Sequence, residues 1–201
     1  MLFDNLIKTN IKANLISIRA YQDSDFNDLH NCFDSEQLKW FPEDYVDFED
    51  YKSQKLSLQE DRKLIMLSLI DNLDDKIFGI TCLFNIDDFH KNLEVGMTWI
   101  DKQYQGTGYN LLFKYYLFKF LIEEIKLNRV YLKTDSNNLK SFHAMNGVGL
   151  NYEVKLLSHM LVKNGTRLRD SELFSVTCKT WENIKSYMIK KLDKKFEDFV
   201  W

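Results

Sequence analysis

The alternation of hydrophobic and polar positions along the chain predicts seven β-strands. Short apolar runs bounded by polar or turn-forming residues are typical of strands that are buried on one or both faces. The segments with this pattern are 15–20, 64–70, 77–83, 93–100, 129–133, 153–162 and 171–177. Segments 71–75 and 163–166, the second with an Asn164-Gly165 pair, have the composition of hairpin turns.

Apolar residues at helical spacing predict helices between these strands. A short helix follows Asp23 or Ser24, and a long helix from about 109 to 126 leaves a wide apolar face for a sheet. Further helices are expected after the acidic loop within 34–50, over 138–146 and over 181–199. The order of elements predicts one α/β domain over 1–201, with its core at about 15–181 and a C-terminal helix at 181–199.

The composition is typical of a globular protein and narrows the function classes. Among the 201 residues, 27 Lys and Arg stand against 30 Asp and Glu, a net charge of −3, which argues against a nucleic-acid-binding surface. Cys32, Cys82 and Cys178 have no CxxC spacing, so a disulfide framework or a cysteine-built metal site is not expected. Charges interrupt the longest apolar stretch, Leu111 to Ile125, and no signal peptide is evident; we therefore expect a cytoplasmic protein without a membrane span.

The segment Gln103-Tyr104-Gln105-Gly106-Thr107-Gly108 is the most informative motif. It lies between a strand that ends at Ile100 and a long helix. Its glycines allow a tight turn with exposed N–H groups, and the positive end of the following helix favours an anion such as phosphate. The spacing matches neither a dinucleotide fingerprint nor a P-loop, and a purely structural turn is the alternative interpretation.

This motif resembles the acetyl-CoA pyrophosphate loop, Q/R-x-x-G-x-G/A, of the GNAT N-acetyltransferases. Three further segments resemble the RimJ/RimL-like branch, the ribosomal-protein N-terminal acetyltransferases. They are the strand Glu94 to Ile100, the segment Lys133 to Ser141, and Arg167 to Ser171 together with Trp181. Four motifs in the family's order are more specific than one, and the resemblance extends from Leu15 to about Trp181.

The resemblance implies a GNAT-type α/β fold: a mixed, mostly antiparallel seven-stranded sheet flanked by helices. The fourth and fifth strands, 93–100 and 129–133, would splay so that pantetheine lies between them like an added strand. The resemblance also implies the residues that bind acetyl-CoA, which are Met97, Trp99, Ile100, Gln103, Gln105, Gly106, Thr107, Gly108, Tyr109, Asn110, Asn138 and Ser141. Asn138 is in addition a preferred N-cap residue for the helix that follows it.

Acyl transfer to an amine requires a neutral nucleophile, so a group that accepts a proton is expected. Glu94 stands where such a base is common in the family; the alternative is a charge on the exposed face of a strand. Met145 stands where many GNAT enzymes have a tyrosine, and the resemblance to the RimL-like branch implies that Ser141 lies near the sulfur of the leaving thiolate instead. The branch's second acidic position falls near His159 or Met160, and His159 is a further candidate base or a structural histidine.

The expected function is acetyl-CoA-dependent N-acetylation of a primary amine by direct attack in a ternary complex, with a protein N-terminus as acceptor. The acidic segment 34–50, with seven carboxylates, would favour a cationic acceptor, or it is a solvated helix face. Alternatives are a small amine acceptor (polyamine, amino sugar or antibiotic) and a non-catalytic acyl-CoA-binding domain, which Met145 and Met160 keep open. No metal, nucleic acid or membrane is expected, and the protein is expected to be a monomer or homodimer.

Overall fold

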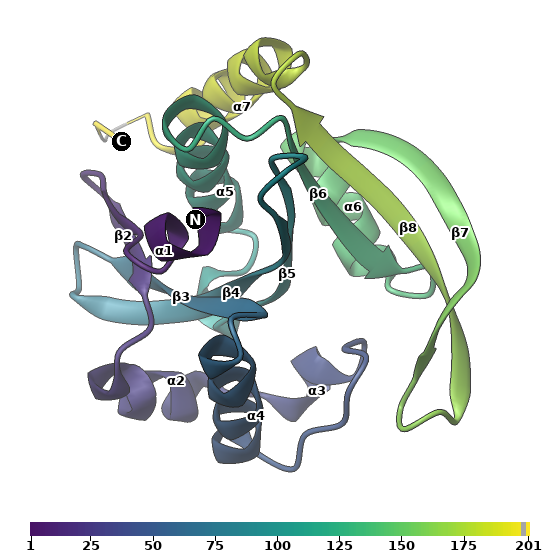
Figure 1. Ribbon diagram of the computed structural model, residues 1–201. Coiled ribbons are helices and arrows are strands. Elements are labelled where there is room, and N and C mark those ends of the chain that lie inside the picture. The colour runs from purple at the N-terminus through teal and green to yellow at the C-terminus, as the bar shows by residue number, and fades with distance from the viewer. Residues whose placement is uncertain (198–199) are drawn as a thin grey trace.

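The strands of the computed structural model, which describes residues 1–197 and 200–201, form one twisted sheet (Figure 1). Its eight strands within the described residues lie in the order β1-β2-β3-β4-β5-β6-β8-β7. Their bounds are β1 Asn10–Lys12, β2 Ile16–Ala20, β3 Leu64–Asp71, β4 Lys76–Asp87, β5 Asn92–Ile100, β6 Arg129–Asp135, β7 Asn151–Val162 and β8 Arg167–Thr177. Only β5 and β6 pair in parallel among these strands, which confirms the mixed, mostly antiparallel sheet.

Helices cover both faces of this sheet. Figure 1 shows α1, α5 and α7 on one side, and α2, α3 and α4 on the other. The helices are α1 Leu2–Leu6, α2 Phe26–Cys32, α3 Ser35–Leu38, α4 Phe48–Glu60, α5 Tyr109–Lys119, α6 Leu139–Val148 and α7 Trp181–Lys195, with short turns η1 Asp23–Asp25, η2 Lys102–Tyr104 and η3 Phe120–Glu124.

The sequence of β3 explains the two layers. Its alternate residues Ile65, Leu67 and Leu69 join the core under α1, α5 and α7, whereas Leu64 and Met66 join the core under α2 and α4. An unbroken apolar run is the pattern of a strand that is buried on both faces. The sheet therefore separates two hydrophobic cores, and a ligand site has to open at an edge or where strands part.

Several predicted boundaries differ from the structure. The seven-strand prediction is one short, because β1 is only three residues long and shows no alternation that could identify it; α1 is likewise absent from the predicted elements. The long helix ends as α5 at Lys119 and continues as the π-helical turn η3, in which Ile125 N donates to Phe120 O over 3.0 Å. The C-terminal helix α7 ends at Lys195 and not at Phe199, which lies outside the described residues.

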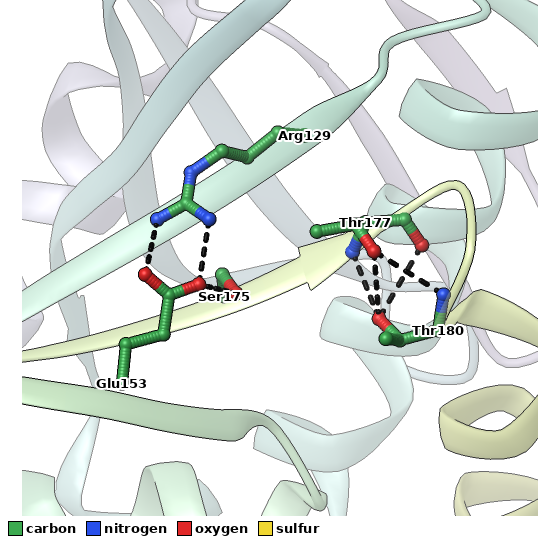
Figure 2. A network of polar contacts seen from close by, with 5 residues as sticks. All are labelled: Arg129, Glu153, Ser175, Thr177 and Thr180. Atoms are coloured by element: carbon green, nitrogen blue, oxygen red, sulfur yellow. Dashed lines mark hydrogen bonds and ion pairs between the residues drawn. The ribbon is translucent and has the colours of Figure 1, made fainter.

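Polar contacts secure the strand order at one end of the sheet, as Figure 2 shows. Arg129 of β6 donates two hydrogen bonds of 2.6 and 2.7 Å to Glu153 of β7, and Ser175 of the intervening β8 also donates to Glu153. Nearby, Thr177 and Thr180 exchange backbone-to-hydroxyl hydrogen bonds of 3.0 and 3.2 Å where β8 turns into α7. These contacts are partly exposed, so their main effect is to fix geometry, with little gain in stability.

A buried carboxylate joins the turn η1, directly before α2, to the sheet. Asp25 is 1% exposed and accepts two hydrogen bonds of 2.7 Å from Arg19 of β2, one of 2.7 Å from Ser68 of β3, and one of 3.0 Å from Gln22 N. Burial raises the pKa of Asp25, but the bonds from Arg19 and Ser68 outweigh it, and the pKa lies below its ordinary value. The ionised form of Asp25 is therefore part of the folded structure.

We expect Asp25→Asn to lower the free energy of unfolding by about 3 kcal/mol at pH 7, because it leaves Arg19 without its buried partner. A folded-state pKa below the unfolded value means that this contribution is complete above about pH 4 and is lost as pH falls through the folded pKa. Urea unfolding from pH 7 to pH 3 measures this. Asp23→Asn, at an exposed neighbouring position, is the control, and equal unfolding midpoints for the two variants would contradict the prediction.

Candidate active site

The strands β5 and β6 part in the middle of the sheet. They pair with each other only at Asn92–Arg129, Leu93–Val130 and Glu94–Tyr131. Beyond these positions β5 continues to Ile100 and β6 to Asp135 without pairing with each other. This confirms the predicted splay of the two strands. Backbone groups in a sheet normally pair with a neighbouring strand, so the facing edges beyond Glu94 can accept a ligand in strand-like fashion.

A β-bulge in β5 accompanies the splay. Ile80 of β4 pairs with Trp99, but Cys82 pairs with Gly96, so two residues of β5 stand opposite one of β4. Met97 within the bulge has φ of 51°, and such bulges bend a strand away from its neighbour. Beyond the bulge the side chain of Trp99 is buried in the core under α2 and α4, and that of Ile100 in the opposite core. A ligand in the gap would thus meet backbone groups, and not the side chains, of Trp99 and Ile100.

The segment after β5 forms a compact turn at the start of α5. Gly106 and Gly108 have φ of 81° and 111°, in the left-handed region that glycine adopts without strain, and α5 begins at Tyr109. Side chains of the turn fold back on its own backbone: Gln105 Nε2 donates to Ile100 O over 2.9 Å, and Thr107 Oγ1 to Tyr104 O over 2.7 Å. The first N–H groups of α5 have no acceptor within the helix and lie beside the two glycines.

Buried aromatic residues hold this turn against the sheet. Tyr104 donates to Asp71, at the end of β3, over 2.9 Å, and its ring lies 4.9 Å from that of Tyr109 and 5.0 Å from that of Phe78. Burial and the hydrogen bond to Asp71 raise the pKa of Tyr104 above its ordinary value. Asp71 and Phe78 come from other parts of the chain, and nothing in the spacing of the glycine motif indicates their role.

The start of α6 lies beside the same turn. Lys140 Nζ donates to Gln105 Oε1 over 2.5 Å, which connects the two segments across the splayed strands. Asn138 Oδ1 accepts from Ser141 N over 3.1 Å, so the predicted N-cap role of Asn138 is confirmed. The structure thereby brings the predicted loop, Asn138 and Ser141 to one end of the gap between β5 and β6.

Glu94 lies at the point where β5 and β6 part, and it is buried. It is 4% exposed, Lys133 Nζ of β6 is 3.1 Å from Glu94 Oε2, and Asn85 Nδ2 donates to the same oxygen over 3.0 Å. The alternative interpretation of Glu94 as an exposed strand charge is therefore wrong. Burial raises the pKa of Glu94 above its ordinary value, and Lys133 and Asn85 only partly offset this. A raised pKa makes a carboxylate a stronger base.

His159 belongs to the same group of side chains. It lies in an irregular part of β7, where the register with β8 shifts between Leu156 and Met160, and its Nδ1 is 3.0 Å from Ser171 Oγ of β8. Burial lowers the pKa of His159, and the charges of Lys133 and Arg169 lower it further. Lys133 therefore affects both candidate bases, Glu94 and His159, although its motif gave no sign of this role.

The acidic segment 34–50 reaches the tip of the β7–β8 hairpin, where Lys163 N donates to Pro42 O over 2.8 Å. Most of its carboxylates have partners in the protein. The ion pairs are Asp34 with Lys102 at 2.6 Å, Glu36 with Lys39 at 4.0 Å, Glu43 with Lys55 at 3.6 Å, and Asp44 with Lys163 at 2.8 Å, and Asp47 caps α4. This pairing weakens the attraction that the sequence predicted for a cationic acceptor.

Metal-binding clusters and membrane spans are both absent from the described residues. No group of three or more His, Cys, Asp or Glu side chains there is placed to hold a metal ion. No helix in the same part of the chain is both long and apolar enough to cross a membrane.

Residues 16–151 match the model of the acetyltransferase (GNAT) domain family, and the chain belongs to this family. Members of the family use acetyl-CoA as acyl donor. The chain is also 30% identical over 112 residues to the Bacillus subtilis protein named "Putative ribosomal N-acetyltransferase YdaF". That match covers 56% of this chain and 60% of the relative, so it spans less than two thirds of the relative's length.

Solved structures of acetyltransferases share the fold. A GCN5-related N-acetyltransferase from Brucella melitensis superimposes with a TM-score of 0.81 at 16% identity, covering 91% of this chain and 85% of that one. The spermidine N-acetyltransferase of Vibrio cholerae, in complex with CoA and spermine, has a TM-score of 0.69 at 18% identity, with 84% and 99% covered. At these identities the likeness establishes the fold alone.

We expect Lys133→Met to raise the pKa of Glu94 further, because the variant removes the charge and hydrogen bond that oppose the effect of burial. The pKa of His159 should rise as well, since Lys133 lowers it. NMR titration of the Glu94 carboxyl carbon and the His159 ring measures both. Lys140→Met, which removes a lysine that contacts Gln105, is the control, and a Glu94 pKa that stays constant or falls in Lys133→Met would contradict the prediction.

Proposed function

We propose that this protein transfers the acetyl group of acetyl-CoA to a primary amine, with a protein N-terminal α-amine as the acceptor. The observation that carries the proposal is the splay of β5 and β6 beyond Glu94, next to a glycine turn at the start of α5. The match to the GNAT domain over 16–151 and the partial match to a protein named as a ribosomal N-acetyltransferase support it.

The donor has a complete set of candidate contacts at this splay. Backbone groups at Met97, Trp99 and Ile100, on the stretch of β5 that does not pair with β6, would bond the pantetheine amides. The pyrophosphate would lie on the turn, whose residues are Gln103, Gln105, Gly106, Thr107, Gly108, Tyr109 and Asn110. The Asn138 amide nitrogen would reach the pantetheine arm, since its oxygen caps α6, and the Ser141 hydroxyl would face the sulfur.

Direct attack by the amine fits the chemistry of the described residues better than an acyl-enzyme does. Burial raises the pKa of Cys82 to about 11 and that of Cys32 to about 12, which makes both thiols poor nucleophiles near neutral pH. The amine itself must lose a proton, and an α-amine, with an ordinary pKa near ~8, loses it more readily than lysine at ~10.4. Glu94 or His159 would accept that proton, directly or through water.

Several observations bear on the class of acceptor. The relative from Bacillus subtilis carries a ribosomal name, whereas a structure of the same fold is a spermidine N-acetyltransferase. The paired state of segment 34–50 argues against a polycation such as spermidine. Met145 is 6% exposed and packs in the core, so it does not occupy the place of a reacting group, which weakens the non-catalytic alternative.

The experiment that tests the function measures free CoA thiol and product mass with acetyl-CoA and a panel of acceptors. The panel contains peptides with free and blocked N-termini, spermidine and an amino sugar. We expect mono-acetylation of the free N-terminal peptides only. Acetylation of spermidine alone would replace the peptide acceptor, and tight acetyl-CoA binding without thiol release for any amine would establish the non-catalytic alternative.

We expect Gly106→Val to weaken acetyl-CoA binding tenfold or more, about 1.4 kcal/mol, because a side chain there would stand where the pyrophosphate approaches the backbone. Gly106 has φ of +81°, and apart from Gly106 and its two chain neighbours no described residue has an atom within 4 Å of the point that a Cβ would occupy. Gly165→Val in the β7–β8 turn is a matched control, with φ of +82° and equally open surroundings. Titration calorimetry measures both, and equal affinities would contradict the assigned phosphate site.

We expect Glu94→Gln to lower turnover by about 10²–10⁴-fold near neutral pH, the usual range for a positioned general base. The wild-type rate should fall as pH drops through the pKa of Glu94, which lies above its ordinary value, because only the ionised carboxylate accepts a proton. The loss in Glu94→Gln should shrink as pH rises towards ~8, where an α-amine arrives already neutral.

The pH–rate profiles of wild type, Glu94→Gln and His159→Gln with one peptide decide between the two candidate bases. A large loss confined to His159→Gln would assign the proton transfer to the histidine. A Glu94→Gln profile that overlays the wild-type profile would remove the carboxylate from the mechanism.

A further inference from the structure

One guanidinium beside the candidate bases has no hydrogen bond to the described residues. Arg169 of β8 is 5% exposed, its Nε is buried without a hydrogen-bond partner, and its guanidinium donates no hydrogen bond to any described residue. Its one ion-pair contact in the described structure is Asp135 Oδ2, 4.0 Å from Nε. Arginine stays charged in proteins and carries five N–H donors. A buried guanidinium in this state is costly unless a further partner completes it.

The pleat of the sheet places Arg169 on the same face as the candidate bases. Ser171 pairs with Asp135 and contacts His159, and Arg169 lies two residues before Ser171 on β8, hence on the same face. Lys133, two residues before Asp135, contacts Glu94 from this face. The opposite face of β8 packs on α6 through Phe174 and Phe142, whose rings are 5.4 Å apart.

The nearby carboxylates are already paired with other cations. Burial lowers the pKa of Arg169, while Asp135, Glu94 and Glu43 act to raise it, which places these carboxylates in its surroundings. Each of them, and the adjacent Asp44, has a partner closer than Arg169. The pairs are Glu94 with Lys133 at 3.1 Å, Asp135 with Arg167 at 2.5 Å, Glu43 with Lys55 at 3.6 Å and Asp44 with Lys163 at 2.8 Å. Arg169 is the surplus cation of this group.

We propose that Arg169 binds a carboxylate of the acceptor and so selects acceptors that carry an acidic group close to the reacting amine. The planar fork of a guanidinium matches the two oxygens of a carboxylate. This inference rests on the proposed function, because it assigns the acceptor class of the same site. Two sources have this chemistry: an acidic side chain in the first residues of a peptide, and the α-carboxylate of a free amino acid.

The arrangement of the two faces of β8 indicates that the partner of Arg169 is the acceptor and not a part of acetyl-CoA. The proposed donor contacts, Asn138 and Ser141, are on α6 and its cap, and α6 packs on the face of β8 opposite to Arg169. The segment 42–44 and the tip of the β7–β8 hairpin close the Arg169 side instead. The acceptor would thus meet Glu94 and Arg169 from one side, and the thioester would reach them through the gap between β5 and β6.

The test compares matched acceptors that differ by one carboxylate. Peptides Ser-Asp-Ala-Ala and Ser-Asn-Ala-Ala, with amidated C-termini, probe the side-chain source, and alanine against alaninamide probes the free amino acid. In at least one of these two pairs, we expect wild type to have a kcat/KM about tenfold or more higher for the acceptor that carries the carboxylate. Arg169→Gln should abolish that preference. Lys155→Gln removes the same charge from an exposed site on the hairpin and should retain the preference, which excludes long-range attraction as the cause.

Equilibrium binding keeps this inference separate from the proposed function. Calorimetry with the same four acceptors, in the presence of CoA, should show the preference in wild type and its loss in Arg169→Gln even where no acetyl transfer is detected. Turnover without any carboxylate preference would overturn the role of Arg169 and leave the acetyltransferase function standing. Carboxylate binding at Arg169 without turnover of any amine would support the subsite and overturn the function.

A stability measurement distinguishes a ligand-binding arginine from a structural one. Arg169→Met retains the length of the side chain and removes the buried charge, so we expect an unchanged or higher melting temperature together with loss of the carboxylate preference. Arg169→Lys keeps the charge but lacks the planar fork, and it should recover only part of the preference. A melting temperature that falls by about 5 °C or more in Arg169→Met would show that Asp135 needs Arg169 in the fold, and would overturn the proposal.

Discussion

The strands β5 and β6 stop sharing hydrogen bonds after Glu94 and Tyr131, and the bulge at Met97 accompanies their separation. Unpaired backbone groups inside a sheet are rarely tolerated, because their hydrogen-bonding capacity is lost unless water or a ligand meets it. Here they face each other across a gap that ends at a glycine turn and at the N-termini of α5 and α6. The gap therefore lies inside the described sheet at a place where an extended ligand could complete the missing pairing.

The same separation explains why charged side chains are buried around it. Glu94 and Lys133 come from the two parting strands and meet where the pairing ends, and Asp135 lies at the far end of β6 with Arg169 of β8 beside it. Removal from water shifts the pKa of Glu94 upward, which strengthens it as a base, and that of His159 downward, which keeps its ring neutral and able to accept a proton.

The two faces of the sheet differ in the groups that they present near the gap. On one side α5 and α6 present their N-termini and the glycine turn, which suit the phosphates and pantetheine of the donor. On the other side the segment 42–44 and the β7–β8 hairpin are joined by Lys163, and their carboxylates are largely neutralised by lysines. In the proposed function, donor and acceptor would therefore approach the gap from opposite faces of the sheet.

Local patterns in the sequence determined all the described strands except β1, most of the helices, the glycine turn and the N-cap role of Asn138, because each depends on residues close together in the chain. They also sufficed to identify the family. The short strand β1, the burial of Glu94 and its pairing with Lys133, the anchoring of Tyr104 by Asp71, and the surplus charge of Arg169 emerged only from the tertiary structure. Each of these depends on which residues meet across strands and on how much water is excluded, and neither is encoded in local spacing.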